Sequence, residues 1–447
     1  MLTPDEWPWQ SWARCAPDRT ALTVDDRAYS WTTLAEKVEA LATGFHRQGV
    51  RAGSGVMLLS GNSEPAVLAY LALLRCGARL LPVNPRLPAC QIATLLPLLN
   101  IDYALTLDGQ APANLPALKI LSQPGAVAHR WQRDAIATLT LTSGSTGLPK
   151  AAAHAFDAHL ASAHGVTTTL GFTADDSWLL SLPLYHVSGQ GILWRWLYRG
   201  GKLMLAENSS EATFASLVPT QLWRLLRQPS LELRTVLLGG VAIPVELTAQ
   251  AEARGVACWC GYGMTETAST VAAKRADGKP GVGQPLPGHR VRLVKGEIAI
   301  QSQALARGYW REGKLLPLTE SDGWFYTRDS GLQVDNDLVI AGRLDNLFFS
   351  AGEGIQPEQV EGVLAQHPAV EQVFIVPLPD EEYGHRPVAL ARLKETGSFP
   401  QLQRWAANRL AGFQRPVRWY TLPELESGAV KYSRRQLADW VWQQRQR

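Results

Sequence analysis

Two short apolar runs flank a helical pattern near the start of the chain, and this alternation constrains the fold more than any other feature of the sequence. Residues 56–60 are almost entirely apolar, and residues 79–83 repeat that character. Between them, residues 64–76 carry apolar side chains at helical spacing. A strand, a helix and a second strand in such close succession form a βαβ unit, which predicts a parallel sheet with a right-handed crossover.

The same alternation returns further along the chain. Residues 176–182 and 202–205 read as strands, and residues 190–198 between them read as a helix. Residues 233–238 form another buried strand that runs into Gly239-Gly240. We therefore expect an α/β fold with layered sheets in the large N-terminal part.

The pattern changes from helical to alternating after about residue 291. Residues 291–294 and 297–301 alternate around Lys295-Gly296, which predicts a β-hairpin. Further strands are predicted at residues 323–327 and 338–340. These segments predict a β-rich subdomain.

The last hundred residues predict a small α+β domain, with strands at 370–377 and 417–420 and a helix at 401–410. Because 447 residues are too many for one core, more than one domain is expected. We predict an N-terminal domain over residues 1–341, a hinge at residues 342–345 and a C-terminal domain over residues 346–447.

Composition excludes several classes of protein. A 46% hydrophobic and 19% charged chain with a net charge of +3 is typical of globular proteins, and its charge is too small to indicate nucleic-acid binding. The five cysteines lack redox or zinc spacing and are expected to be free thiols. The most apolar stretch is interrupted by Arg75 and Arg79, so we expect no membrane span. The N-terminus has no signal-peptide pattern, and the predicted location is the cytoplasm.

A run of glycines and hydroxyl side chains ends in a lysine near residue 150. Glycines let backbone N–H groups turn inward, hydroxyls add neutral donors, and a lysine adds a positive charge, a combination that suits a polyphosphate. The residues are Thr142, Ser143, Gly144, Ser145, Thr146, Gly147 and Lys150. Leu148 and Pro149 separate Gly147 from Lys150, which excludes the P-loop of the NTPases.

This run resembles the phosphate loop of the adenylate-forming enzymes: acyl-CoA synthetases, luciferases and the adenylation domains of peptide synthetases. Further stretches match the same family in the same order, so the resemblance covers nearly the whole chain. It implies ATP and Mg²⁺ as partners of the site, coenzyme A as cosubstrate, and a small C-terminal domain that rotates between two half-reactions.

A second matching stretch spans residues 261–267, Gly-Tyr-Gly-Met-Thr-Glu-Thr. By resemblance, Tyr262 stacks on adenine, Thr265 binds the α-phosphate and Glu266 lies near the metal. A carboxylate is a suitable ligand for Mg²⁺, directly or through water. Gly239 and Gly240 resemble the strand end that forms the other wall of the adenine slot, where glycine allows close approach.

Matches in the C-terminal third concern the ribose, the hinge and catalysis. The resemblance assigns Asp329 and Arg343 to the ribose and Asp345 to the hinge. A carboxylate can accept both hydrogen bonds of a cis-diol, which suits the first assignment. Lys431 is the expected catalytic lysine, which would bridge the attacking carboxylate and the phosphate by electrostatics. Val430 stands where the family has glycine.

The acyl pocket is expected around residues 181–196. By resemblance, His186 lies beside the path of the thiol, as wall and gate, and we group it with Lys431 and Thr265 as residues that touch the reacting groups. Residues 186–196 further resemble the o-succinylbenzoate–CoA ligases of menaquinone synthesis. A dicarboxylic acid needs a partner for the carboxylate that is not activated. We expect Arg195, flanked by Trp194 and Trp196, to be that partner, with Ser188 as an added donor.

The sequence thus predicts conversion of 2-succinylbenzoate to 2-succinylbenzoyl-CoA through an acyl-adenylate. Alternatives are a synthetase for another aryl or fatty acid, a stand-alone amino-acid adenylation domain, and a nucleotide-binding protein without catalysis. A homo-oligomer is one of the assembly states that the sequence leaves open. His154, His159 and His164 are five residues apart, which does not place them on one helix face, so no metal cluster is expected there.

Overall fold

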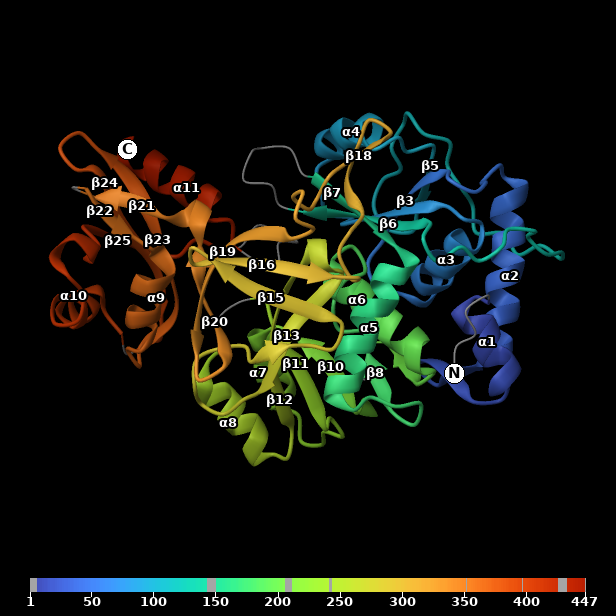
Figure 1. The fold of residues 1–447 in the computed structure, drawn as a ribbon, viewed down its shortest axis with the longest axis horizontal. Coiled ribbons are helices and arrows are strands. Elements are labelled where there is room, and N and C mark those ends of the chain that lie inside the picture. Colours follow the sequence, from blue (N-terminus) through green and yellow to red (C-terminus); the bar gives the residue numbers. More distant parts are fainter. Residues whose placement is uncertain are drawn as a thin grey trace. The chain divides into compact units, whose positions relative to one another are not determined.

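The structure, a computed structural model, describes residues 6–142, 150–205, 211–240, 243–350, 352–395, 397–424 and 432–446. The chain divides into two compact units (Figure 1). The large unit comprises residues 1–292, 299–325 and 333–339. The small unit comprises residues 293–298, 326–332 and 340–447.

One sheet of the large unit contains the predicted βαβ unit. Its strands β3 and β4 pair in parallel, and α3 (Glu64–Arg75) connects them, which confirms the prediction. Residues 66–75 of α3 are all buried, as expected for a helix that is apolar on every side. The strand order is β18 (Lys314–Leu316), β17 (Gly308–Arg311), β7 (Lys150–Ala155), β6 (Ile136–Thr142), β4 (Arg79–Val83), β3 (Gly55–Leu59) and β5 (Tyr103–Thr106).

A second sheet of the large unit contains the other predicted strands. Its order is β14 (Gln284–Pro285), β13 (Ser269–Arg275), β12 (Ala257–Met264), β11 (Thr235–Leu238), β10 (Phe214–Leu217), β8 (Ser177–Leu179), β9 (Lys202–Met204), β1 (Thr20–Val24) and β2 (Arg27–Ser30). β8 is shorter than the predicted strand 176–182, because the Ser181 N–H turns back to donate to the Leu179 carbonyl oxygen at 2.9 Å instead of to a neighbouring strand.

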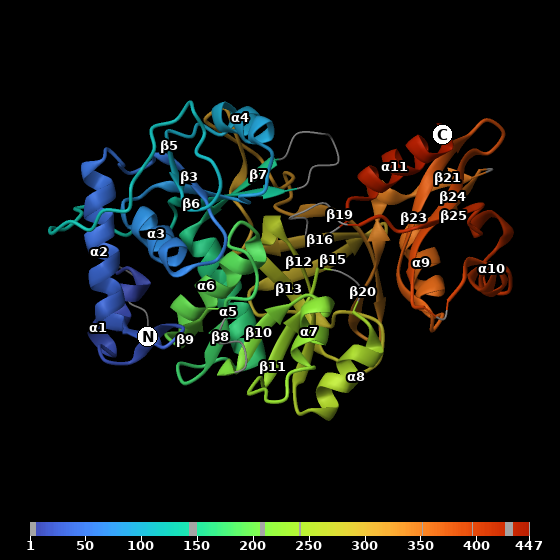
Figure 2. The ribbon, with the colours of Figure 1, turned by 180° about the vertical axis from the view of Figure 1, so that it is seen from behind.

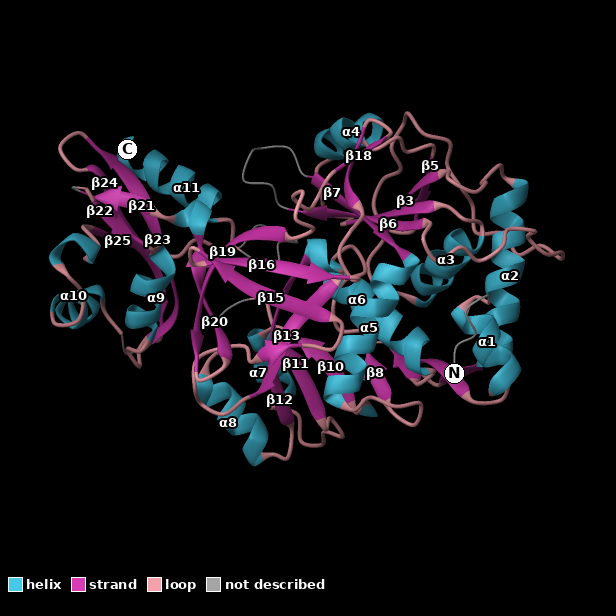
Figure 3. Ribbon diagram, in the orientation of Figure 1, coloured by secondary structure: helices cyan, strands magenta, loops and turns pink. Residues whose placement is uncertain are grey.

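Two helices lie side by side between these sheets (Figures 2 and 3). α5 (Phe156–Leu170) contacts β7 of the first sheet and β13 of the second, and α6 (Val187–Arg199) contacts β13 and β8. Each helix ends at a glycine in the left-handed region, Gly171 and Gly200. The predicted helix 190–198 is therefore confirmed and begins three residues earlier.

The other helices of the large unit cover its outer faces. The helix α1 (Pro8–Cys15) packs on α2 (Trp31–Arg47). The Ser30 hydroxyl caps the first turn of α2. The remaining helices on these faces are α4 (Ala89–Leu98), α7 (Pro219–Leu225) and α8 (Val245–Ala253).

The β-rich segment forms a sheet in the order β15 (His289–Val294), β16 (Glu297–Ser302), β19 (Phe325–Val334) and β20 (Asp337–Arg343). Lys295 and Gly296 have φ values of 52° and 82°, as a two-residue hairpin turn requires. The predicted hairpin is confirmed. Residues of its strands fall into both units.

The small unit is a sheet covered by helices on both faces. Successive residues of β23 (Val370–Asp380) point to opposite faces, so Ile375 joins the core under α9 (Pro357–Ala365) and α10 (Phe399–Ala407), whereas Val376 joins the core under α11 (Arg434–Gln446). The other strands are β21 (Phe348–Ser350), β22 (Glu353–Ile355), β24 (Gly384–Leu393) and β25 (Arg418–Thr421).

The predicted α/β class, with a large N-terminal and a smaller C-terminal part, is confirmed. All five cysteines are free thiols. Among the described helices, none has the length and apolar character that crossing a membrane requires. The hinge at 342–345 stays a prediction.

Candidate active site

The ends of β6 and β7 frame the run that is predicted to bind phosphate. Thr142 and Lys150 are register partners at the ends of an antiparallel pair, so the chain leaves and re-enters the sheet at one point. Ser143, Gly144, Ser145, Thr146 and Gly147 lie outside the described residues. Lys150 itself is exposed at the start of β7.

The second motif runs along β12 into a short 3₁₀ turn, η2 (Thr265–Thr267). The register of β12 against β13 shifts between Tyr262 and Gly263. A Cβ at Gly263 would lie 1.9 Å from the Ser269 carbonyl oxygen, so only glycine fits there. Tyr262 is partly buried.

The two glycine segments lie at the ends of paired neighbouring strands, and their predicted place in an adenine slot stays a prediction. A Cβ at Gly239 would lie 3.3 Å from the Gly261 carbonyl oxygen, which is close contact between the end of β11 and β12. Gly240 has φ 85°, a conformation that favours glycine.

Strand β7 holds the turn η2 through a histidine that the sequence analysis did not assign to the site. The His154 Nε2 donates to the Thr265 carbonyl oxygen at 2.7 Å, because a carbonyl can only accept. Burial lowers the pKa of His154 to about 4, so the ring is neutral at neutral pH. Strand β7, which begins at Lys150 of the first motif, is therefore in direct contact with the second motif.

A tyrosine provides a second link between the two motifs. The Lys150 Nζ lies 4.9 Å from the centroid of the Tyr309 ring. The Tyr309 hydroxyl donates to the Glu266 Oε1 at 2.8 Å. Sequence reasoning missed Tyr309, because it stands in β17, about 160 residues after the phosphate run.

Arg195 is a buried charge that the described chain does not neutralise. Its side chain is 1% exposed. The guanidinium donates to the Ser216 Oγ at 2.9 Å and the Ser269 Oγ at 2.6 Å, and its Nε has no partner among the described residues. Burial lowers the pKa of Arg195 to about 9, still above neutral pH, so the side chain is charged.

The tryptophan over Arg195 is not one of the two that the sequence analysis placed beside it. Arg195 lies over the ring of Trp178 in β8, 5.0 Å from its centroid. Trp196 stacks on Trp31, and Trp194 stacks on His159. Neighbouring residues on a helix point in different directions, so both flanking tryptophans belong to the core.

Ser188, Gly191 and Arg195 share one face of α6, whereas the predicted gate residue His186 lies about half a turn round the helix from Arg195. His186 is exposed at the N-cap position, and Ser188 is half-buried, two turns before Arg195. Gly191 lies one turn before Arg195. A Cβ at Gly191 would lie 3.0 Å from the Ser269 Oγ and 3.2 Å from the Arg195 Nη2, so the glycine leaves room for this pair.

In the small unit, the predicted ribose residues lie together. The Arg343 guanidinium donates to the Asp329 carboxylate at 3.0 Å and the Asp345 carboxylate at 2.9 Å. Arg328 pairs with Asp345 at 3.1 Å. Lys431 lies outside the described residues.

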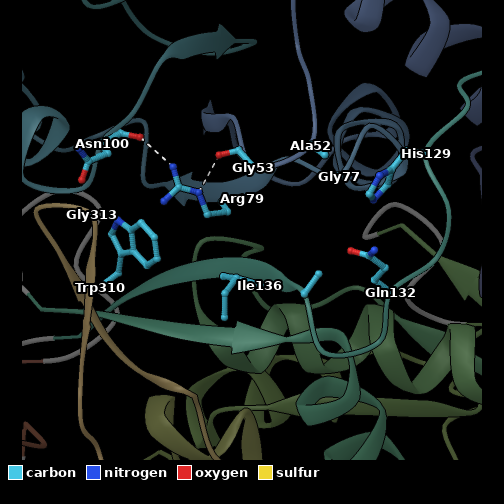
Figure 4. A pocket seen from close by; sticks show the side chains of 11 residues that line it. Ala52, Gly53, Gly77, Arg79, Asn100, His129, Gln132, Ile136, Trp310 and Gly313 are labelled. Carbon is cyan, nitrogen blue, oxygen red and sulfur yellow. Dashed lines mark hydrogen bonds between the residues drawn. The ribbon is translucent and has the colours of Figure 1, made fainter.

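A hollow of about 540 Å³ in the large unit includes no predicted site residue (Figure 4). Arg79 and Trp310 line it, with the guanidinium 4.2 Å from the centroid of the Trp310 ring. Arg79 also donates to two backbone carbonyls, those of Gly53 and Asn100.

Comparisons with known proteins identify the family of this chain. The AMP-binding enzyme family model matches residues 9–310, and the AMP-binding enzyme C-terminal domain model matches residues 359–429. The 2-succinylbenzoate–CoA ligase of Salmonella typhimurium is 52% identical over 98% of this chain and 99% of its own.

Solved structures are similar over nearly the whole chain. "R195K E. coli MenE with bound OSB-AMS" is 51% identical, with a TM-score of 0.91 and coverage of 99% of both chains. The o-succinylbenzoate coenzyme A synthetase (MenE) from Bacillus subtilis, in complex with ATP and magnesium ion, is 27% identical, with a TM-score of 0.88 and coverage of 97% of this chain and 99% of its own. This chain belongs to the family of AMP-binding enzymes.

Proposed function

We propose that this chain is an ATP-dependent acid–CoA ligase that converts 2-succinylbenzoate to 2-succinylbenzoyl-CoA through an acyl-adenylate, as a step of menaquinone biosynthesis. The names of its relatives support the reaction. The buried guanidinium of Arg195, which no carboxylate of the described chain neutralises, supports a substrate that carries a second carboxylate.

The reaction has two steps at one site. An oxygen of the succinyl carboxylate attacks the α-phosphorus of ATP, and pyrophosphate leaves. The sulfur of coenzyme A then attacks the acyl carbonyl carbon, AMP leaves with the carboxylate oxygen, and the thiol proton is released. The protein contributes positioning and charge stabilisation rather than a covalent intermediate.

The large unit would bind the nucleotide. The phosphates would be bound by Thr142, Lys150 and the run between them. Tyr262 would stack on the adenine, and Thr265 would bind the α-phosphate. Glu266 fits Mg²⁺ or its hydration water, because a carboxylate can accept contacts beyond the one from Tyr309. Magnesium bound with ATP neutralises phosphate charge.

Arg195 would bind the carboxylate that is not activated. A guanidinium presents its donors in a planar fork that matches a carboxylate, and the Nε of Arg195 has no partner in the described chain. The hydroxyls of Ser216 and Ser269 accept from its Nη1 and Nη2 and hold the fork in place. Ser188 lies on the same helix face as a further donor, and His186 stands at the start of that helix as the gate for the thiol.

The remaining proposed residues belong to the C-terminal third. Asp329 and Arg343 would bind the ribose, and Asp345 would be the hinge between residues 1–341 and 346–447. Lys431 would stabilise the adenylation transition state. We expect Lys431→Ala to abolish adenylation while a supplied acyl-adenylate is still converted to thioester; equal loss of both steps would contradict this division.

Mass detection of the thioester formed from 2-succinylbenzoate, ATP and coenzyme A tests the proposed reaction. A panel of other aryl and fatty acids, with pyrophosphate release as the readout, tests the choice of acid. We expect 2-succinylbenzoate to react much faster than any other acid of the panel. Faster turnover of a monocarboxylic acid would contradict the substrate. The cytoplasmic location stays a prediction, and the oligomeric state stays open.

A further inference from the structure

We propose that Tyr309 is a positioning residue for the adenylation step, which keeps the Lys150 ammonium and the Glu266 carboxylate apart and ready for phosphate and metal. The inference rests on the proposed function, because it assigns these two charges to MgATP. It adds a residue that belongs to neither of the two motifs.

The register of the sheet places Tyr309 between the motifs. Tyr309 of β17 is the antiparallel partner of Ala152 in β7. Lys150 lies two residues before Ala152, so the two share a face of β7, and Tyr309 is a diagonal neighbour of Lys150 on that face. Ala152 has only a methyl group, which leaves this part of the face to the ring and the lysine.

The two ends of the Tyr309 side chain contact opposite charges. The ring faces the Lys150 ammonium at 4.9 Å, an attraction between a cation and the negative face of an aromatic ring. The hydroxyl donates to the Glu266 carboxylate at 2.8 Å. Neither Lys150 nor Glu266 takes part in an ion pair within the described part of the chain, although one tyrosine touches both.

This arrangement prevents the two charges from neutralising each other. A lysine and a glutamate at a common surface tend to pair directly, and the pair would have to break before Lys150 could bind phosphate or Glu266 could bind magnesium. With Tyr309 between them, each charge is oriented while its remaining contacts stay available. Glu266 is fixed further by its own carbonyl, which accepts from the Ala306 N–H at 2.8 Å.

Trp310, the next residue along β17, provides a matched control. Successive strand residues point to opposite faces, and Trp310 lies against Arg79 in the hollow of Figure 4, where its Nε1 donates to the Leu99 carbonyl oxygen. A substitution there perturbs the same strand without touching Lys150 or Glu266.

The test compares Tyr309→Phe, Tyr309→Leu and Trp310→Phe in ATP–pyrophosphate exchange as Mg²⁺ is varied. Tyr309→Phe keeps the ring and loses the hydrogen bond to Glu266, so we expect the half-saturating Mg²⁺ concentration to rise about tenfold. Tyr309→Leu also loses the ring, so the KM for ATP should rise by about threefold or more. Trp310→Phe should leave both quantities unchanged, and all three variants should convert a supplied acyl-adenylate at the wild-type rate.

Wild-type Mg²⁺ dependence in both tyrosine variants would overturn the inference. An equal fall in the rates of both half-reactions, together with a lower melting temperature, would also overturn it, because that pattern indicates that Tyr309 only stabilises the fold. Calorimetric titration of MgATP into the same variants gives a second readout that needs no acid substrate. It should show weaker binding to Tyr309→Leu even if 2-succinylbenzoate proved to be the wrong acid, whereas unchanged binding would contradict the role of Tyr309.

Discussion

Two arginines, one in each unit, differ in what neutralises them: Arg195 is buried, whereas the Arg434 side chain is 19% exposed. Arg434 of the small unit donates to the carboxylates of Glu361 and Glu358 and to the Ile375 carbonyl oxygen. Arg195 of the large unit has two serine hydroxyls and an aromatic ring, and no carboxylate of the described chain. A charge neutralised within the chain holds the fold together, whereas a charge left without a counter-ion indicates a ligand that brings one.

The pKa shifts of the two groups follow the same division. Burial acts to lower the pKa of Arg434, but Glu361 and Glu358 outweigh burial and raise it. Burial alone acts on Arg195 and lowers its pKa. The large unit therefore carries a cost in its free energy of folding that an anionic substrate would offset on binding.

The largest effect should follow from removing the neutralised arginine. We expect Arg434→Met to lower the free energy of unfolding by about 3 kcal/mol, because it leaves the Glu358 and Glu361 carboxylates with neutral hydrogen-bond donors only, and the Glu361 side chain is 15% exposed. Urea unfolding, followed by a spectroscopic signal from the small unit, measures this free energy. Arg435→Met, at the exposed neighbouring position, is the control and should change stability little. Equal effects at both positions would show that the ion pairs of Arg434 with Glu358 and Glu361 do not stabilise the fold.

Removing the other arginine should affect catalysis instead. We expect Arg195→Gln to lower kcat/KM for the acid roughly 100-fold, the cost of losing one partner of a buried charge pair, with little change in the KM for ATP. Steady-state kinetics with each substrate varied provide the measurement. Arg199→Gln, one turn later on α6, controls for disturbance of the helix. A similarly large rise in the KM for ATP would show that Arg195 does not act in the acid site.

The comparison also shows what the sequence could and could not predict. Arg195 was predicted from the resemblance of residues 186–196 to o-succinylbenzoate–CoA ligases and from the need of a second carboxylate for a cationic partner. Its contacts Ser216, Ser269 and Trp178 come from three strands, and only the order and register of the second sheet bring them together. Trp194 and Trp196 were assigned from adjacency in sequence, which on a helix does not mean a shared face.

The fold was predictable where the pattern was strong. The βαβ unit, α6 and the hairpin at Lys295-Gly296 follow from local signals. Tyr309 and His154 carry no such signal, because their contacts with Glu266 and Thr265 depend on how β17 and β7 lie beside a distant turn. Long-range contacts between motifs are therefore what the structure adds.

His154 of the large unit avoids the cost of burying a charge by staying neutral. Burial lowers the pKa of His154 to about 4, below its ordinary value, so the unfolded chain binds the proton first and stability falls as the pH falls. We expect a loss of about 3 kcal/mol between pH 6.5 and 4 from this residue. His154→Gln, whose amide can still donate to Thr265, should flatten that part of the profile. An unchanged profile would show that His154 is not buried in its neutral form.

The smallest effect should appear when the methionine substitution is made at Arg195. We expect Arg195→Met to change the free energy of unfolding by less than about 1 kcal/mol, or to raise it, because no carboxylate loses a partner. The same urea measurement applies. A loss as large as that of Arg434→Met would show that Arg195 is neutralised within the chain, and the contrast between the two arginines would disappear.

The most direct test of the central claim pairs a change in the protein with a change in the acid. The analogue 4-oxo-4-phenylbutanoate keeps the carboxylate to be activated and lacks the one on the ring. With wild-type protein, the analogue should lose roughly 100-fold in kcat/KM relative to 2-succinylbenzoate, whereas with Arg195→Met the two acids should react nearly alike. If the losses from the variant and the analogue multiply instead, Arg195 does not bind the second carboxylate.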